Sequence, residues 1–564
     1  MEKRALICVR VCLFVYTGFM LYYSPRVNSD TAVQIAQVVS YLNGDGFTQG
    51  YAKTEDIART KRAYDKTFAP GVQYIMLLLM VFLSLSQAIW VAGMVAMILI
   101  WESCLFFLRY SAPETRTSQL CIYCVLFGFS PILFQYCGLS DLFSLGFFLF
   151  STALSVKVLL GEKEGLKPMA WALGIGIAAY LTCLFRYAYY FFFWIPIFIL
   201  ILYAFADKRL WKYVFISCFV TSILLALQLS QQSGKEYVQS RHTNDRHLYW
   251  EDLSLTTNFV ADSFYETEIV GVICSKILPG SETSFSDGVT QMVLTSLILG
   301  IFIVFLVKWI KPVWGWERIK WKEFLSLPKS SFVLFAVTTV LCNVLVIIVL
   351  TVFLGRVAIG GDGGVFWTYV EEKRYFAPLA VVLWLVLVMA KSYSFRAYQL
   401  SMIVIAVTAL CGFLQNGSKI KSYHEYKGIE SLYYMSGQIY AERDKTNVFI
   451  TPSLSQNYAE YASMAGARLC TTDSAIKSNL KASVPVVLYI PVPSDLPSIE
   501  DKRKLEILVK KTNARVWMKV KTYGITTIYR TIIRPKPRTM MVSEKAVSWH
   551  QKISDGKAGL LCQK

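Results

Sequence analysis

Eleven long apolar stretches recur along this chain, and they constrain its fold more than any other feature. Each has about the 17 to 25 residues that an α-helix needs to cross the hydrocarbon core of a bilayer. They are residues 5–23, 87–108, 118–134, 139–159, 168–185, 187–206, 211–230, 289–309, 331–353, 376–391 and 396–414. A shorter stretch at 71–85 is expected to be a partial or re-entrant span. With 55% hydrophobic residues, the chain is predicted to be an α-helical multi-pass membrane protein with about 11 to 13 transmembrane helices.

The basic residues between these stretches predict which loops face the cytoplasm. They fall in alternate loops: Arg109 and Arg116; Lys157, Lys163 and Lys167; Lys208, Arg209 and Lys212; Lys308, Lys311, Arg318, Lys320 and Lys322; Lys391 and Arg396. By the positive-inside rule these five loops are cytoplasmic. The N-terminus, which we expect to begin an uncleaved anchor, is then also cytoplasmic. Loops 24–70, 231–288 and 354–375 and the segment after residue 415 are predicted to be external.

The polar segment after the last span is expected to form a separate external domain, residues 416–564. Strands are predicted at 447–451, 467–470, 485–490, 515–520 and 524–533, and helices at 455–465 and 499–512. Strands that alternate with helices are typical of a small α/β layer structure. The segment has no nucleophile elbow and no glycine-rich fingerprint, so we expect an accessory domain, with acceptor binding and stability as equally open roles.

Charge and metal-ligating residues restrict the partners. The segment from residue 415 carries 24 lysines and arginines against 12 acidic residues. Such an excess suits an anionic lipid surface or glycan, or simply a solvated basic surface, and we expect no nucleic-acid partner. The four histidines are scattered and have no metal-binding spacing, so no residue is predicted to ligate a metal.

The stretch after the first span is predicted to be a short amphipathic helix on the membrane surface. Asp30, Gln34 and Gln37 recur at helical spacing on one face, and Asn28 or Ser29 supplies an N-cap. An aspartate in the first turn is also favoured by the helix dipole alone. These residues therefore leave a catalytic and a purely structural role open for Asp30.

Asp141 and Arg186 stand at two predicted external helix ends. An ionisable residue between apolar helices is a candidate functional residue, although Asp141 in this position also suits a simple N-cap. Arg186 lies among aromatic residues, where an arginine either binds a phosphate or snorkels to the interface. Further on, Arg374 and Tyr375 begin an Arg-Tyr-x-x-Pro pattern that enters a span.

The two aspartates at these positions and the Arg-Tyr-x-x-Pro pattern resemble features of polytopic C-type glycosyltransferases that use polyprenyl-phosphate sugars. This group (the GT-C fold) includes family 39, the protein mannosyltransferases and the aminoarabinose transferases. The resemblance covers residues 1–415 in organisation. The chain departs from the best-known members by having Ser-Asp-Thr around Asp30, where they pair the aspartate with a neighbouring glutamate.

The resemblance implies an inverting transferase in a bacterial plasma membrane. Such an enzyme would move a sugar from a polyprenyl phosphate to a lipid, glycan or protein acceptor on the external face. Asp30 would be the general base; Asp141 would orient its surroundings, bind the acceptor or share a divalent cation such as Mg²⁺ or Mn²⁺. The candidates for binding the donor phosphate are Arg186, Arg374, Lys61 and Arg62, and those for binding substrate are Gln34, Tyr375 and Arg356.

Two other functions fit the sequence less well. A lipid-linked glycan polymerase or ligase would place its functional residues in the external loop 231–288. A transporter or flippase would carry charges deep within its spans and a repeated architecture. The charges here gather at one predicted face instead.

Overall fold

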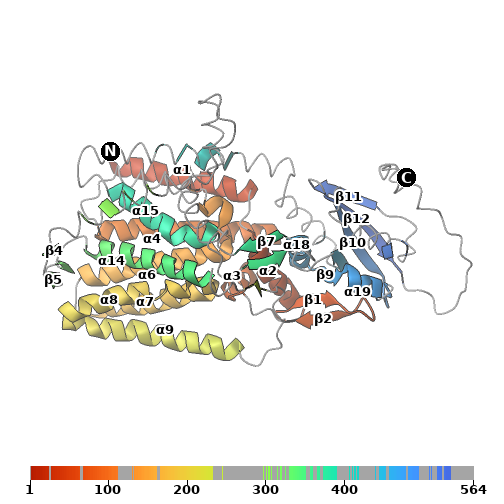
Figure 1. The fold of residues 1–564 in the computed structure, drawn as a ribbon, viewed down its shortest axis with the longest axis horizontal. Helices are drawn as coiled ribbons and strands as arrows, with labels where there is room; N and C mark the ends of the chain where they lie inside the picture. The colour runs from red at the N-terminus through yellow and green to blue at the C-terminus, as the bar shows by residue number, and fades with distance from the viewer. Residues whose placement is uncertain are drawn as a thin grey trace, which may run out of the picture. The chain divides into compact units, whose positions relative to one another are not determined.

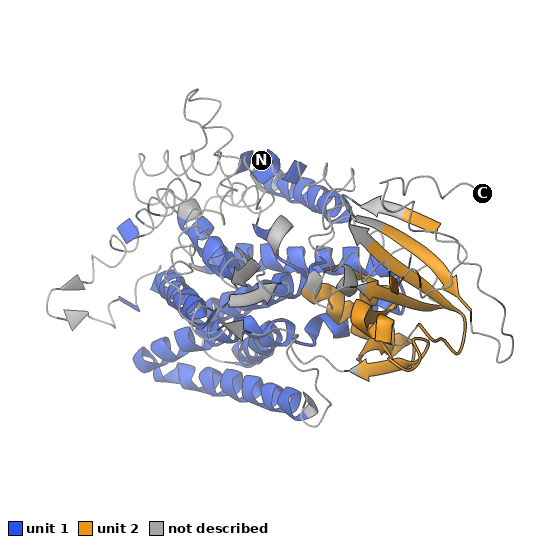
Figure 2. Cartoon of the chain, turned by 45° about the vertical axis from the view of Figure 1, so that its right-hand side comes forward, with its two compact units in different colours: residues 1–28, 66–235, 242–421 blue, residues 29–65, 236–241, 422–564 orange. Residues whose placement is uncertain are grey.

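The computed structural model describes two compact units. Residues 2–23, 27–63, 68–111, 130, 132–161, 165–232, 330–350, 373–389, 444–451, 457–477, 480–493, 518–523 and 526–534 are described, together with short pieces elsewhere between 244 and 510. One unit comprises residues 1–28, 66–235 and 242–421, and the other comprises residues 29–65, 236–241 and 422–564 (Figure 2). We call them the helical unit and the sheet unit.

The helical unit consists mainly of long apolar helices. They are α1 (Glu2–Tyr23), α3 (Gly71–Met80), α4 (Leu85–Ser111), α6 (Leu139–Leu160), α7 (Leu166–Phe185), α8 (Ile195–Ala206), α9 (Trp211–Gln232), α14 (Ser330–Val349) and α15 (Ala377–Met389). Figure 1 shows α4, α6, α7, α8 and α9 with roughly parallel axes. Within the described residues, seven helical segments are long and apolar enough to cross a membrane. The predicted multi-pass helical fold is therefore confirmed.

The individual span predictions have different outcomes. Those at 5–23, 87–108, 139–159, 168–185, 187–206, 211–230 and 331–353 are confirmed as apolar helices of spanning length. The span expected at 376–391 corresponds to the shorter helix α15, and the partial span at 71–85 to α3. The spans expected at 118–134, 289–309 and 396–414 lie mostly outside the described residues.

Small and hydroxyl-bearing residues bring the long helices close together. Ser144 of α6 donates a hydrogen bond to the Thr182 carbonyl of α7 over 2.9 Å, and Ser217 of α9 donates to the Ala172 carbonyl of α7 over 2.9 Å. A Cβ atom on Gly176 would lie 2.8 Å from the Ser217 carbonyl oxygen. Small residues allow such close backbone approach in membranes, where apolar burial between helices supplies little driving force.

The sheet unit contains a mixed seven-stranded sheet. Its strands are β1 (Gln49–Ala52), β2 (Thr60–Ala63), β8 (Thr446–Thr451), β9 (Arg468–Thr471), β10 (Val486–Pro493), β11 (Met518–Tyr523) and β12 (Thr526–Ile533). Their order is β11-β12-β10-β8-β9-β1-β2. Strand β8 runs parallel to both β9 and β10, whereas β1–β2 and β11–β12 pair antiparallel. The α/β character predicted for the polar C-terminal segment is confirmed.

Two strands of this sheet come from the first loop rather than from the C-terminal segment. Strand β1 pairs in parallel with β9 at Tyr51 and Leu469. Helix α2 (Ser29–Leu42) belongs to the same unit and packs against α18 (Asn457–Met464). Gln34 and Gln37, expected on a polar face, are both buried. The predicted helix is present, but these two glutamine side chains are enclosed rather than exposed to water.

Candidate functional site

Asp141 lies in the first turn of α6, inside the helical unit. Gly138 precedes the helix, and its backbone N–H donates a hydrogen bond to Asp141 Oδ2 over 3.0 Å. This local bond is the capping role that the sequence allowed. The residue is nevertheless only 1% exposed, so its carboxylate does not face water as a simple surface cap would.

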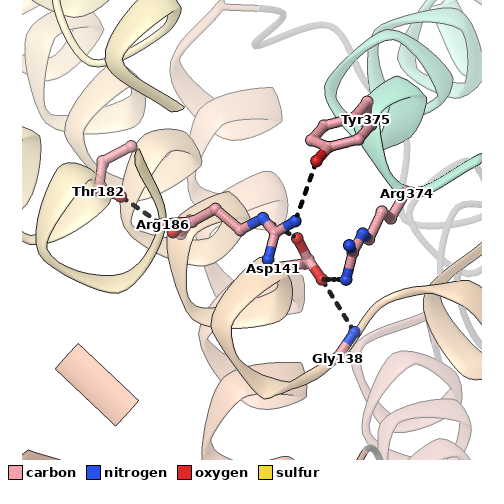
Figure 3. A network of polar contacts seen from close by, with 7 residues as sticks. Gly138, Asp141, Thr182, Arg186, Arg374 and Tyr375 are labelled. Carbon is pink, nitrogen blue, oxygen red and sulfur yellow. Dashed lines mark hydrogen bonds and ion pairs between the residues drawn. The ribbon is translucent and has the colours of Figure 1, made fainter. Parts of the chain in front are cut away.

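Two arginines from distant parts of the chain lie against this carboxylate. Arg186 follows the last residue of α7, and its Nε lies 2.8 Å from Asp141 Oδ1. Arg374 lies in the 3₁₀ turn Lys373–Phe376 that leads into α15, and its Nη1 lies 3.9 Å from Asp141 Oδ2. Each arginine is 8% exposed. Figure 3 shows both guanidinium groups directed at the carboxylate.

Tyr375 joins the two arginines. Arg186 Nη2 donates to the Tyr375 hydroxyl over 3.3 Å, and the two guanidinium carbons lie 5.5 Å (Arg186) and 5.6 Å (Arg374) from the centre of its ring (Figure 3). Those distances suit cation–π attraction. Asn343 of α14 donates from Nδ2 to the Tyr375 backbone carbonyl over 3.0 Å, which holds the turn against the helices.

The charges of this cluster favour an anion. One carboxylate and two guanidinium groups leave one net positive charge in a largely buried position. A buried charge is costly unless it is paired. Arginine binds phosphate and carboxylate oxygens through paired N–H donors, so an anionic group is the ligand that this arrangement suits.

Three residues near the cluster were not predicted from the sequence to belong to the site. Asn343 is a polar side chain within an otherwise apolar span, and that contrast was a usable signal. Asn28 was expected only as an N-cap, and Gly138 gave no such signal. A Cβ atom on Gly138 would lie 2.5 Å from Asn28 Oδ1, so only glycine fits beside Asn28 as it is placed.

Four residues of the predicted site lie together within the helical unit. Asp141, Arg186, Arg374 and Tyr375 form one cluster. Asp30 and Gln34 lie on α2, in the sheet unit. Arg356 begins strand β6 (Arg356–Ile359), which pairs with β7 (Val365–Thr368); its side chain lies outside the described set.

Lys61 and Arg62 also lie in the sheet unit. They belong to the edge strand β2, opposite Tyr51 and Gly50 of β1. Arg62 forms an ion pair with Asp45 and so helps to close the chain between α2 and β1. The loop 231–288, on which the polymerase or ligase alternative depends, falls almost entirely outside the described residues.

No family profile matches the sequence, and no curated protein matches it. The chain is similar in structure to apo ArnT from Cupriavidus metallidurans, with a TM-score of 0.42, 9% identity, and coverage of 94% of this chain and 97% of the other. It is also similar to an oligosaccharyltransferase from Archaeoglobus fulgidus, bound to zinc and sulfate. There the TM-score is 0.43, the identity 12%, and the coverage 91% of this chain and 72% of the other.

Proposed function

We propose that this protein is a membrane glycosyltransferase that transfers a sugar from a polyprenyl phosphate to an acceptor hydroxyl of a lipid, glycan or protein. The observation that carries this function is the buried cluster of Asp141, Arg186, Arg374 and Tyr375. It lies where α6 begins, where α7 ends and where the chain enters α15. A net positive site at the ends of membrane helices suits a phosphate whose lipid tail stays in the bilayer.

The proposed chemistry is a single displacement with inversion. The bond from the acceptor oxygen to the anomeric carbon forms while the bond from that carbon to the phosphate oxygen breaks. The acceptor proton passes to the Asp30 carboxylate, and the lipid monophosphate leaves with the electron pair. A neutral hydroxyl is a weak nucleophile, so it needs a positioned base. Fixed cations stabilise the charge that develops on the leaving phosphate, a role that we assign to Arg186 and Arg374.

The membrane orientation is part of the same proposal. We place the N-terminus in the cytoplasm and the Asp141 cluster on the external face of a bacterial plasma membrane. Every second loop is rich in lysine and arginine, and the positive-inside rule assigns those loops to the cytoplasm. A donor on that face is lipid-linked, since nucleotide sugars are cytoplasmic. The proposed function also allows a bound divalent cation, such as Mg²⁺ or Mn²⁺, at a position other than Asp141.

Substitution of Asp30 by asparagine tests the base assignment. We expect Asp30→Asn to lower turnover of a radiolabelled polyprenyl-phosphate sugar in membrane vesicles by about 100-fold or more, because the variant cannot accept the proton. Binding of undecaprenyl phosphate, the lipid present in a second ArnT structure, should persist.

Asp207→Asn is the matched control. Asp207 also stands at a helix start, where it accepts a hydrogen bond from the Arg209 N–H, but it is not part of the cluster. Turnover by this variant should equal that of the wild type. Unchanged turnover in Asp30→Asn at equal protein level would rule out Asp30 as the base and would direct attention to loop 231–288.

A further inference from the structure

We propose that Asp141 is a positioning residue that arranges Arg186 and Arg374 as a binding site for the donor phosphate. In this assignment it is neither a proton acceptor nor a metal ligand. The inference rests on the proposed use of a lipid phosphate and narrows the roles that the sequence left open for Asp141.

The first argument is that both carboxylate oxygens already have partners within the protein. Oδ1 faces Arg186 Nε at 2.8 Å, and Oδ2 accepts the Gly138 N–H at 3.0 Å and faces Arg374 Nη1 at 3.9 Å. The residue is 1% exposed. A general base must reach the proton that it removes within hydrogen-bonding distance, and this carboxylate is enclosed by its own neighbours.

The second argument concerns cations. A divalent ion bound to Asp141 would lie next to two guanidinium groups, and like charges at such short range repel strongly in a buried site. Metal-binding carboxylates instead gather with other acidic or neutral ligands. In the described part of the helical unit, the charged side chains against Asp141 are both basic.

The third argument is the effect of Asp141 on the arginines. Arginine has a long side chain, and fixing it in one geometry costs conformational entropy. Asp141 orients the two guanidinium groups, and Tyr375 orients Arg186 through its hydroxyl. The carboxylate also offsets one of the two positive charges. The two arginine side chains are therefore already ordered before the phosphate binds, so binding does not have to supply the entropy cost of ordering them.

The test measures equilibrium binding of undecaprenyl phosphate to the purified full-length protein, without turnover. We expect Asp141→Asn to keep the shape of the side chain and its bond from Gly138 N–H but to lose both ion pairs. The dissociation constant should rise by about tenfold or more, the scale of a lost charge-assisted contact. Asp207→Asn, which loses an exposed ion pair with Arg209, should bind like the wild type.

A double-mutant cycle separates positioning from a general effect on folding. If Asp141 acts through Arg186, then Asp141→Asn should weaken binding far less in an Arg186→Lys background than in the wild type. Asp141→Glu is the second variant, in case the asparagine variant does not fold. It keeps the charge but displaces the guanidinium groups by one methylene, so weaker binding is again expected.

Titration with Mn²⁺ completes the test. We expect Asp141→Asn to leave any saturable Mn²⁺ binding unchanged. Loss of Mn²⁺ binding in this variant would overturn the inference and would indicate that Asp141 is a metal ligand. Unchanged or tighter lipid-phosphate binding by both Asp141 variants, with turnover lost, would overturn it in favour of a catalytic role. Failure of the wild type to bind undecaprenyl phosphate at all would instead refute the proposed function itself.

Discussion

Arg186 shows how much a single residue depends on its surroundings. As a lone arginine among aromatic residues it was compatible with snorkelling to the membrane interface. In the structure it is 8% exposed, its Nε faces Asp141, and its Nη2 donates to Tyr375. The side chain is thus turned into the protein, where its guanidinium group lies against Asp141 and Tyr375 and does not reach for water.

Tyr375→Phe tests the orientation of Arg186. The variant keeps the aromatic ring but removes the hydroxyl that accepts from Arg186 Nη2. We expect undecaprenyl phosphate to bind about threefold to tenfold more weakly, in line with the net contribution of about 0.5 to 1.5 kcal/mol from one hydrogen bond. Binding is measured at equilibrium on the purified protein.

The control for that experiment is Tyr110→Phe. The ring of Tyr110 contacts Lys157, and Lys157 lies at the opposite end of α6 from Asp141. The substitution should therefore leave lipid-phosphate binding unchanged. Equal binding by Tyr375→Phe and the wild type would show that the hydroxyl does not orient Arg186.

At the scale of helices, a charged residue at each end of α6 contacts the neighbouring segments. Asp141 lies at its beginning, and Lys157 lies in its last turn. The Lys157 ammonium is 4.3 Å from the centre of the Trp171 ring on α7 and 4.9 Å from that of Phe106 on α4. Between these ends, hydroxyl groups such as Ser144 bond to carbonyls of α7. The Asp141 end therefore contacts the residues after α7 and before α15, and the Lys157 end contacts α4 and α7.

Lys157→Met tests the contribution of the second end. The variant keeps an apolar stem but loses the cation that attracts the aromatic rings. We expect it to destabilise the helical unit by about 1 to 2 kcal/mol, the range for a cation–π contact that is partly removed from water. The measurement is the thermal unfolding midpoint in detergent.

Lys167→Met provides the matched comparison. Lys167 lies in the first turn of α7 and is exposed, so its loss should leave the midpoint unchanged. An equal midpoint for Lys157→Met and the wild type would show that the aromatic contacts contribute nothing to stability.

At the scale of the whole molecule, the chain connects segments far apart in sequence within the sheet unit. Gln49 Nε2 donates to Ser463 Oγ across 414 positions. Asp56, in the turn between β1 and β2, accepts the Ser483 backbone N–H at 3.1 Å, across 427 positions. The Ile57 N–H donates to the Lys481 carbonyl over 2.9 Å. The first loop is therefore an integral part of the sheet unit.

The Asp56 carboxylate predicts how the sheet unit responds to acid. Burial alone would raise its pKa, but hydrogen bonds from Ser483 and Ala58 and the charge of Arg59 together lower the pKa below its ordinary value. A carboxyl group with a lowered folded pKa stabilises the fold above its unfolded pKa of about 4. That contribution is lost as the pH falls through the folded pKa.

We therefore expect Asp56→Asn to destabilise the sheet unit more at pH 6 than at pH 3. Hydrogen exchange of β1 and β10 amides at the two pH values measures this difference. An identical effect of the substitution at both pH values would contradict the assignment. Asp473→Asn, a substitution of an acidic residue in the first turn of α19 (Thr472–Lys477), is the control.

The sequence by itself determined the described long helices of the helical unit and the strands of the polar C-terminal segment. Both follow from local signals: long apolar runs such as 139–159 predict spanning helices, and short alternating segments such as 447–451 predict strands. It also singled out Asp141, Arg186, Arg374 and Tyr375 as separate candidates, because polar residues at the ends of apolar helices are conspicuous.

Only the tertiary structure decided which of these residues meet. Arg186 and Tyr375 are 189 positions apart, and no local periodicity links them. Likewise, nothing in the pattern of residues 49–63 placed β1 beside β9. Local propensity reports the conformation of a segment, whereas long-range pairing depends on packing and on the ordering of the intervening chain. For that reason the elements were readable from the sequence, whereas the meeting of Asp141, Arg186, Arg374 and Tyr375 was not.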